Sequence, residues 1–309
     1  MSRVPTPAAA SQPDPQASRR AAGLALAVLG AIAFSGKAII IKLAYRHDVD
    51  AVTLIMYRML FALPFFLVMA WWAGRGKPPL SRRDVLALVL LGMSGYYLSS
   101  YLDFLGLQYI SASLERLILY LSPTMVMLLG LLLYKRSISP WQALGMAVSY
   151  SGIALVFAHE IALQGRDAVL GASLVFVSAL LYATYLVYSG ELVKRLGSLR
   201  LVGWATTVAC VCCIVQFALL RPMSAALVPT AVLGLSLINA LVCTVAPVLM
   251  IMMAVERVGP GITSQAGMVG PIATLLMGVL ILDEALTPWV VGGAALVIIG
   301  IYIFSRGRS

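Results

Sequence analysis

The sequence predicts an all-α polytopic membrane protein, with ten transmembrane helices arranged as two inverted five-helix repeats. Composition is the first observation: 61% of the 309 residues are hydrophobic, only 11% are charged, and the mean hydropathy is +0.97, which is not typical of a soluble domain. Segment length is the second, because the apolar segments run about 18 to 25 residues, enough for a helix to cross about 30 Å of hydrocarbon. The third is an internal repeat that reverses its charge.

The predicted helices use nearly the whole chain and leave no room for a soluble domain. In the first half they cover residues 21–45, 51–73, 83–109, 112–134 and 138–158, and in the second half residues 168–190, 199–220, 227–255, 260–282 and 287–305. Because the connecting loops are short, neighbouring helices are expected to run antiparallel.

The domain organisation follows from these helices. We expect a disordered cytoplasmic N-terminus over 1–20, a first repeat over 21–160, a second repeat over 168–305 and a cytoplasmic tail over 306–309. Residues 1–20 are rich in Ala, Pro, Ser and Gln, a composition typical of disorder. A signal peptide is disfavoured, because the next apolar segment is too long for a signal core and contains Lys37 and Lys42.

The net charge of +10 is better explained by membrane topology than by nucleic-acid binding. Lys and Arg are concentrated in alternate loops, and cytoplasmic loops are enriched in these residues. This distribution predicts a multi-pass protein of the cell (inner) membrane with both termini in the cytoplasm. The expected partners are the lipid bilayer and a small-molecule substrate, without nucleic acid, and the sequence leaves the oligomeric state open.

The chain repeats without a gap at an offset of 148 residues. The residues Pro123, Gly130, Pro140, Trp141, Gly145 and Gly152 coincide with Pro271, Gly278, Pro288, Trp289, Gly293 and Gly300. Between these positions the basic pair Lys135 and Arg136 falls on the acidic pair Asp283 and Glu284. Because Lys and Arg are retained on the cytoplasmic side, this reversal predicts that the two copies cross the membrane in opposite directions. Inverted repeats are typical of secondary transporters.

At these positions the chain resembles the drug/metabolite transporter (DMT) superfamily, and specifically its EamA-type ten-helix members. The resemblance covers nearly the whole chain and rests on Ser122–Thr124, Gly270–Ile272 and the pair Asp283–Glu284 followed by Pro288 and Trp289. Phe34 and Lys42 also fit the first helix of the family, whereas Lys37 departs from the neutral polar side chain usual there. The resemblance implies a solute carrier, often an exporter of amino acids or related metabolites, with a central cavity between the halves.

Six ionisable side chains fall within the predicted membrane segments, where each costs on the order of 2.5–3.5 kcal/mol. They are Lys37, Lys42, Arg58, Asp103, Glu115 and Arg116. With a rise of about 1.5 Å per residue, all six lie in the outer third of the membrane, and Lys42 is close enough to the interface to extend into it.

The other five charged residues form a candidate cluster with a surplus positive charge. This surplus indicates either a site for a substrate carboxylate or phosphate, or an outer gate. The structural alternative is a set of salt bridges that closes the outer end of the bundle and adds no net stability. The second-half equivalents are uncharged, namely Tyr185, Thr206, Ile251, Thr263 and Ser264, and this asymmetry favours a specialised role.

Aromatic and amide side chains extend the candidate site. Tyr96 and Asp103 share one face of the third helix, with Tyr97 and Tyr101 on the adjoining face. The full set predicted to bind substrate or form a gate is Lys37, Arg58, Tyr96, Tyr97, Tyr101, Asp103, Glu115, Arg116, Tyr120, Tyr182, Tyr185, Asn239 and Gln265. Interfacial anchoring is the alternative role for the tyrosines, and bridging between helices is the alternative for the two amides.

Pro123 and Pro271 are predicted as helix breaks in mid-helix at equivalent depth. Each proline removes a backbone hydrogen bond, and paired breaks are typical of a transport path. Kinks that serve only helix packing are the alternative.

Enzyme and metal motifs are absent from the sequence. Residues Gly30–Ala38 differ from a phosphate-binding loop in glycine spacing and lack its hydroxyl, so neither ATP nor a cofactor is expected. The cysteines Cys210, Cys212, Cys213 and Cys243 have no metal or redox spacing, and His47 and His159 are isolated. We therefore expect no catalytic or metal-binding residue.

These observations together predict a secondary transporter rather than an enzyme. We expect it to move small metabolites such as amino acids across the inner membrane by alternating access, as an exporter or exchanger. One alternative is a membrane-embedded enzyme acting on lipid-linked substrates, for which Asp283 and Glu284 are the candidate residues. A passive channel or scaffold is the other.

Overall fold

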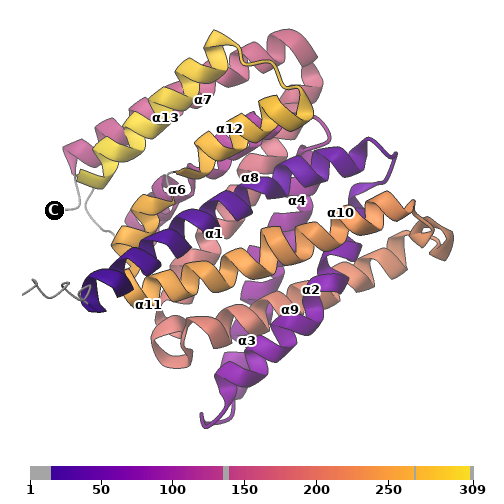
Figure 1. The fold of residues 1–309 in the computed structure, drawn as a ribbon, viewed down its shortest axis with the longest axis vertical. Helices are drawn as coiled ribbons and strands as arrows, with labels where there is room; N and C mark the ends of the chain where they lie inside the picture. The colour runs from indigo at the N-terminus through magenta and orange to yellow at the C-terminus, as the bar shows by residue number, and fades with distance from the viewer. Residues whose placement is uncertain (1–14, 135–138, 268, 307–309) are drawn as a thin grey trace, which may run out of the picture.

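A computed structural model describes residues 15–134, 139–267 and 269–306, and within these ranges the chain is helical without a β-strand (Figure 1). The first half contains α1 (Pro15–Tyr45), α2 (Ala51–Gly74), α3 (Arg82–Leu91), η1 (Gly92–Leu98), α4 (Ser99–Gly106), α5 (Ala112–Leu119), α6 (Ser122–Tyr134) and α7 (Pro140–Gln164). The second half contains α8 (Arg166–Leu196), α9 (Ser198–Leu220), η2 (Met223–Ala226), α10 (Thr230–Ala240), η3 (Leu241–Val245), α11 (Ala246–Ala266), α12 (Val269–Leu282) and α13 (Pro288–Arg306).

The prediction of an all-α polytopic membrane protein is confirmed. Among the described residues, eight helices are long and apolar enough to cross a membrane, and Val269–Leu282 and Pro288–Phe304 are shorter apolar helices. Three of the long ones are composite. One joins α3, η1 and α4, another joins α5 and α6, and the third joins α10, η3 and α11.

Local sequence explains where several helices begin. The Asp50 carboxylate caps α2 by accepting hydrogen bonds from the backbone N–H groups of Val52 and Thr53. Ser81 and Ser139 cap α3 and α7, each within a capping box, and Ser111 caps α5. Such side chains satisfy N–H groups that have no partner within the helix, so the short connections end at defined residues.

Two boundaries differ from the sequence-based expectation. Helix α1 begins at Pro15, so residues 15–20, expected to be disordered, are helical. The Ala and Arg residues of this segment are good helix formers, and the long apolar helix that follows extends through them. Helix α11 continues to Ala266, through the loop expected before residue 260. The side chains of Arg257 and Val258 lie against Gly23 of α1, which keeps this segment packed as a helix.

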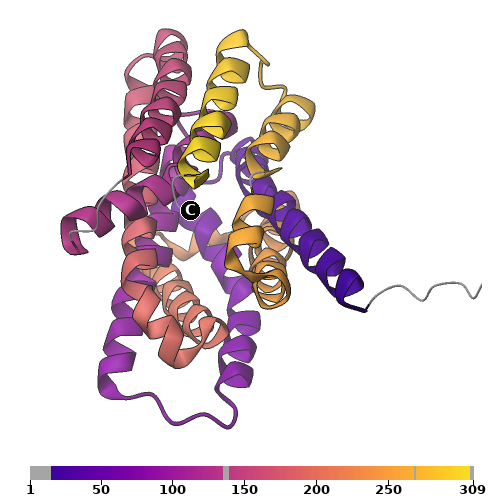
Figure 2. The same cartoon turned by 90° about the vertical axis from the view of Figure 1, so that its left-hand side faces the viewer.

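The two halves are related by a pseudo-two-fold axis, as the packing of α7 against α13 shows (Figures 1 and 2). Gly145 lies against the carbonyl of Gly300, and Gly152 lies against the carbonyl of Gly293. The offset of 148 residues converts one contact into the other. Because the partner number falls as the chain number rises, the two helices are antiparallel. An axis that exchanges antiparallel helices is perpendicular to them, which is the geometry of an inverted repeat.

A second pair of contacts obeys the same relation. Gly23 of α1 lies against Val258 of α11, and Gly171 of α8 lies against Ile110, which follows α4. Residue 23 is equivalent to 171, and residue 110 to 258. Small residues at these positions allow close approach of the helices. Equivalent glycines therefore make equivalent contacts in the two halves.

The bundle has two ends, which we name by a residue in each. The Glu284 end carries the connections 46–50, 107–111 and 283–287, and the Lys77 end carries the connection 75–81, drawn in purple at the bottom of Figure 2, and the turn at Gly197. At the Lys77 end, Arg195 of α8 forms an ion pair with Asp84 of α3, and Lys77 donates a hydrogen bond to the carbonyl of Leu196 (3.2 Å). The two halves are therefore in contact at this end.

Candidate functional site

A cavity of about 730 Å³ lies between the two halves. This volume falls within the range of about 300–1,000 Å³ that is typical of small-molecule sites. Its polar lining includes Lys37, Arg58, Tyr96, Ser100, Asp103, Arg116, Tyr120, Tyr182, Thr206 and Thr244. Gln142 in the first turn of α7 and Phe304 in the last turn of α13 also line it, so the cavity extends toward the Lys77 end.

Lys37 of α1 lies between two buried carboxylates. Its Nζ atom is 2.5 Å from Oδ2 of Asp103 in α4 and 3.1 Å from Oε1 of Glu115 in α5. The exposed fractions of the three residues are 6%, 3% and 0%. The sequence predicted a common cluster for these residues, and the structure brings them together at the end of the cavity nearer Glu284.

Arg58 of α2 is held by the second half of the protein. Its Nε atom donates a hydrogen bond to Oγ1 of Thr244 (3.0 Å), and Thr244 donates to the carbonyl oxygen of Asn239 (2.9 Å). Thr244 lies in η3, a π-helical segment, and such segments are frequent at functional sites. The guanidinium carbon lies 5.2 Å from the ring centroid of Phe104. Nη1 of Arg58 is buried without a hydrogen-bond partner among the described residues.

Arg116 of α5 is anchored in a similar way. Its Nη2 atom donates to Oγ of Ser35 in α1 (2.6 Å), and Ser35 donates to the carbonyl of Gly270 in α12 (2.9 Å). The guanidinium carbon lies 5.3 Å from the ring centroid of Phe34 and 5.6 Å from that of Tyr120. Within the described part of the chain its Nε atom has no hydrogen-bond partner. Arg58 is thus held by a hydrogen bond to the second half, whereas Arg116 is held by a serine of its own half that in turn contacts the second half. Each guanidinium group keeps a nitrogen without a hydrogen-bond partner among the described residues.

The two helix breaks lie at the prolines, but not in mid-helix as expected. Pro123 is the second residue of α6 and Pro271 the third residue of α12, so both occupy first turns, where the missing N–H is tolerated. The Tyr120 hydroxyl, in the first break, donates to the carbonyl of Gly267 in the second break (2.5 Å). The side chain of Pro123 is outside the described residues.

Three tyrosines form one aromatic group beside the cavity. The ring centroids of Tyr96 and Tyr185 are 4.9 Å apart, and those of Tyr182 and Tyr185 are 5.8 Å apart. Tyr96 and Tyr182 line the cavity, and Tyr185 is buried behind them. Tyr96 belongs to η1 (Gly92–Leu98), a π-helical segment at the position equivalent to η3. Gly95 makes room for the ring of Tyr185.

Other predicted site residues lie elsewhere. Tyr97 and Tyr101 pack against the apolar core between α1, α2 and α9, because the face of the composite third helix that carries them is turned away from the cavity. Asn239 is buried, and Oδ1 of its side chain accepts no hydrogen bond from the residues that the structure covers. Its backbone carbonyl takes part in the site through Thr244. Gln265 is in the last turn of α11, and its side chain is outside the described residues, as are Lys135 and Arg136.

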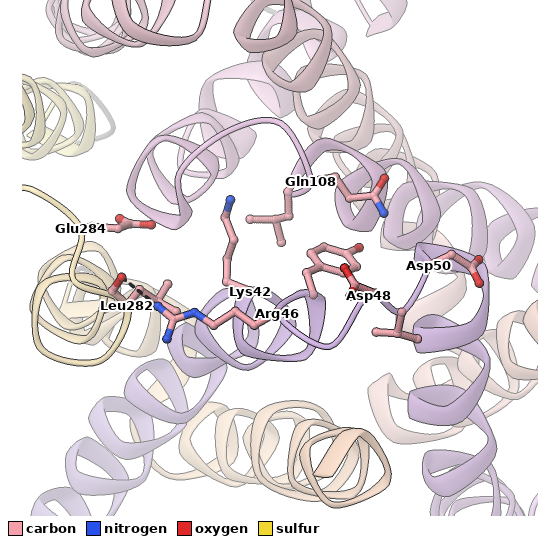
Figure 3. A pocket seen from close by; sticks show the side chains of 10 residues that line it. Lys42, Arg46, Asp48, Asp50, Gln108, Leu282 and Glu284 are labelled. Carbon is pink, nitrogen blue, oxygen red and sulfur yellow. Dashed lines mark hydrogen bonds between the residues drawn. The ribbon is translucent and has the colours of Figure 1, made fainter. Parts of the chain in front are cut away.

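A second pocket, of about 690 Å³, lies at the Glu284 end. Lys42 and Glu284 point into it, and Asp48, Asp50 and Gln108 are around it (Figure 3). We call it the end pocket. Asp103 lines the central cavity and Leu107, one helical turn further along the chain, lines the end pocket. The two spaces are therefore separated by about one helical turn, roughly 6 Å.

The layer between the two pockets combines apolar and polar contacts. Phe104 is fully buried, and its ring lies against the guanidinium group of Arg58. The backbone carbonyl of Phe104 accepts a hydrogen bond from the hydroxyl of Tyr45 (2.6 Å). Tyr45 lines the end pocket, whereas Arg58 lines the cavity. Together with Lys37, Asp103 and Glu115, these residues close the cavity toward the Glu284 end.

Sequence reasoning did not identify the role of Glu284. Its carboxylate accepts hydrogen bonds from the backbone N–H of Ala112 (2.7 Å) and from Oγ of Ser113 (2.6 Å), at the start of α5. Glu284 therefore caps α5, a helix that is distant from it in the sequence. Ser35 and Thr244 were also missed, because single hydroxyl residues in apolar helices have no distinctive spacing.

The described residues contain no group of three or more His, Cys, Asp or Glu side chains that could hold a metal ion. The four cysteines are free thiols, and Cys210, Cys213 and Cys243 are buried.

Known proteins match this chain over nearly its whole length. The EamA-like transporter family matches it twice, over residues 21–158 and 169–306. "Uncharacterized transporter YcbK" of Bacillus subtilis (strain 168) is 31% identical over 284 residues, which cover 86% of this chain and 87% of that protein. "Uncharacterized transporter YyaM" of the same organism is 24% identical over 250 residues, or 78% and 80% of the two chains.

Two further likenesses agree with these matches. An "Uncharacterized transporter" of Archaeoglobus fulgidus is 27% identical over 172 residues, which cover 55% of this chain and 58% of that protein. A crystal structure with 16% sequence identity gives a TM-score of 0.61 and covers 92% of this chain and 97% of its own. That structure shows the fold alone. The two family matches and the extended similarity to YcbK place the chain in the EamA-like transporter family, within the drug/metabolite transporter superfamily.

Proposed function

We propose that this transporter carries small anionic or zwitterionic metabolites, such as amino acids, through the central cavity. The observation that supports this proposal best is the pair Arg58 and Arg116. Both line the cavity, Arg58 is held by Thr244 of the second half and Arg116 by Ser35 of its own half, and each keeps a buried nitrogen without a hydrogen-bond partner among the described residues. Buried polar groups usually have partners, and a carboxylate or phosphate suits a guanidinium.

The charge balance of the cluster also supports an anion. Lys37, Arg58 and Arg116 are opposed by Asp103 and Glu115, which leaves at least one positive charge over, even when both carboxylates are ionised. A buried net charge is unfavourable unless it is paired. A substrate anion would supply the missing charge, and the aromatic rings of Tyr96 and Tyr182 would contact the rest of a small metabolite.

The shape of the cavity supports alternating access. It extends to residues at the Lys77 end and is closed toward the Glu284 end by the layer around Phe104. With both termini in the cytoplasm of an inner-membrane protein, as the distribution of Lys and Arg predicts, this arrangement faces inward. Rocking of one half against the other would open the end pocket and close the Lys77 end, and we propose that it does so during export or exchange.

Counterflow tests this proposal. Purified protein in liposomes would be preloaded in turn with amino acids, organic acids, amines and sugar phosphates, and uptake of the labelled solute would be measured. We expect saturable exchange with an anionic or zwitterionic pool, abolished in Arg116→Gln and retained in Arg166→Gln, which changes an exposed arginine at the start of α8. Uptake that rises linearly without counterflow would indicate a channel. No exchange of any pool by folded protein would contradict the proposal.

A further inference from the structure

Glu115 differs from the other members of the charged cluster in its surroundings. Its exposed fraction is 0%, and it is not among the residues that line the cavity. Neither oxygen of its carboxylate has a hydrogen-bond partner among the described residues. A bound substrate would touch Lys37, Asp103 or Arg116, but not this side chain.

The two cations nearest to Glu115 also interact with other groups. Lys37 is its ion-pair partner at 3.1 Å, but the same ammonium group lies closer to Asp103, at 2.5 Å. Arg116 follows Glu115 in the chain, and its guanidinium group is directed to Ser35 and to the rings of Phe34 and Tyr120. One ammonium group therefore serves two carboxylates.

The other charged groups near the start of α5 among the described residues are Glu284 and Lys42 of α1, which both point into the end pocket (Figure 3). Glu284 is at the start of α5 and carries a negative charge, satisfied by hydrogen bonds from Ala112 and Ser113. Helices α7, α8 and α13 pack against α5 through apolar side chains, including Val156, Val175 and Val290. The charges that act on Glu115 are those of Lys37, Asp103 and Arg116.

We propose that Glu115 is a proton-binding site, coupled through Lys37 to the anion that binds in the cavity. Burial of an ionised carboxylate costs several kcal/mol unless it is paired and hydrogen-bonded. The Glu115 carboxylate shares its one ion-pair partner, Lys37, with Asp103 and has no hydrogen bond among the described residues. Protonation removes its charge and leaves Lys37 paired with Asp103. The coupling to an anion rests on the proposed function, whereas the proton site itself rests on the contacts of Glu115.

The coupling follows from the position of Lys37 between Glu115 and the cavity. An anion in the cavity attracts the ammonium group of Lys37 and repels an ionised Glu115, so it favours the protonated form. Linkage is reciprocal, and protonation of Glu115 therefore favours binding of the anion. In an exchanger the proton would accompany the anion in each direction.

Infrared difference spectroscopy tests the proton site without any substrate. We expect the purified wild-type protein at neutral pH to show the carbonyl band of a protonated carboxylic acid, shifted by exchange into heavy water. The band should be lost in Glu115→Gln and retained in Glu256→Gln, which changes an exposed glutamate of α11. Absence of the band from the wild type, or its persistence in Glu115→Gln, would overturn the proposal. If Glu115→Gln does not fold, absence of the band from the wild type still overturns the proposal, and Glu115→Asp, which should keep a band at a shifted frequency, assigns it to this side chain.

A second comparison tests the role of Lys37. Removing its charge should raise the pH at which the Glu115 band disappears, just as an anion that attracts the ammonium group would. We expect this rise in Lys37→Gln and no change in Lys77→Gln, which alters an exposed lysine at the opposite end of the bundle. An unchanged midpoint in Lys37→Gln would refute the coupling. Because these spectra need no substrate, a failed counterflow assay contradicts the proposed function and leaves the proton site standing.

Discussion

Glu284, in the connection between α12 and α13, accepts a hydrogen bond from the backbone N–H of Ala112, the first residue of α5 (2.7 Å). The contact joins the second repeat to the first at the end where the cavity is closed. A carboxylate at a helix N-terminus is favourable because it satisfies N–H groups that lack partners and interacts with the helix dipole. Glu284 therefore stabilises the closed arrangement of this end.

Glu284→Gln should weaken this closure. An amide keeps one hydrogen-bond acceptor but loses the charge, so we expect a loss of about 1 kcal/mol. Thermal unfolding in detergent measures the change. Asp283→Asn is the matched control, because Asp283 is exposed, has a positive φ of 60° and is replaced by a residue that tolerates this conformation. Equal stability of Glu284→Gln and the wild type would show that the carboxylate contributes nothing to the closure.

A second contact between the halves predicts acid sensitivity. The Asp50 carboxylate accepts hydrogen bonds from Oγ1 of Thr53 (2.6 Å) and from Nε of Arg221 at the end of α9 (3.0 Å). Partial burial raises the pKa of Asp50, but the hydrogen bonds from Thr53 and Arg221 outweigh this effect and hold the pKa below its ordinary value. The stabilisation is thus present above the unfolded-state pKa of about 3.9 and is lost as the pH falls through the folded-state pKa.

We therefore expect the melting temperature to decrease when the pH is lowered below about 4. The decrease should be smaller in Asp50→Asn, because an asparagine keeps the helix cap without titrating. Asp48→Asn, at an exposed residue of the same connection, should retain the wild-type pH dependence. A wild-type melting temperature that does not change on acidification would contradict the assignment.

The ten helices could be predicted because each depends on a long apolar segment, a property that survives any arrangement of the neighbours. The inverted repeat was also visible, since glycines such as Gly145 and Gly293 serve equivalent helix contacts and are therefore retained in both copies. The exact ends of helices were less predictable. The passage of α11 through residues 256–259 depends on its packing against α1, which no local pattern encodes.

The membership of the charged cluster could be predicted from the cost of burying charge, but its pairing could not. Lys37 could have paired with either carboxylate, and only the tertiary arrangement of α1, α4 and α5 gives it both. The π-helical segments η1 and η3 have no sequence signal, and they determine where Tyr96 and Thr244 point. For the same reason Tyr97 and Tyr101 were expected in the cavity, whereas they pack in the core.

The pairing of Lys37 with Asp103 predicts a charge-reversal result. Lys37→Asp and Asp103→Lys should each abolish counterflow, because each leaves two like charges buried together. The double variant restores an opposite pair and should recover part of the transport. Coupling energies between residues in contact are about 0.5–3 kcal/mol. Reversal of the exposed charge of Arg166, at the start of α8, provides the comparison and should leave transport close to the wild-type rate. Additive losses in the Lys37 and Asp103 double variant would argue against a direct pair.

The inverted repeat predicts opposite sides for equivalent loops. Cysteines introduced at Lys135 and Asp283 should be labelled by a membrane-impermeant thiol reagent from opposite faces of the membrane, because the offset of 148 residues relates these two positions. Labelling in intact cells and in inverted vesicles measures the side. The native Cys212 is partly exposed and is replaced by serine for this experiment, whereas Cys210, Cys213 and Cys243 are buried. Labelling of both positions from one face would contradict the inverted topology.

Gly95 in η1 predicts how closely the aromatic group must pack. A Cβ atom at this position would collide with the ring of Tyr185, so Gly95→Ala must displace Tyr185 and, with it, Tyr96 at the cavity wall. Overpacking of this kind costs about 1–3 kcal/mol, and we expect both a lower melting temperature and a higher substrate concentration at half-maximal counterflow. Gly234→Ala is the matched control, because nothing lies within 4 Å of a Cβ atom there. If Gly95→Ala and Gly234→Ala behave alike, the tyrosine group does not shape the substrate site. A rise in half-saturation confined to Gly95→Ala would indicate that the cavity wall formed by Gly95 and Tyr96 contacts the substrate.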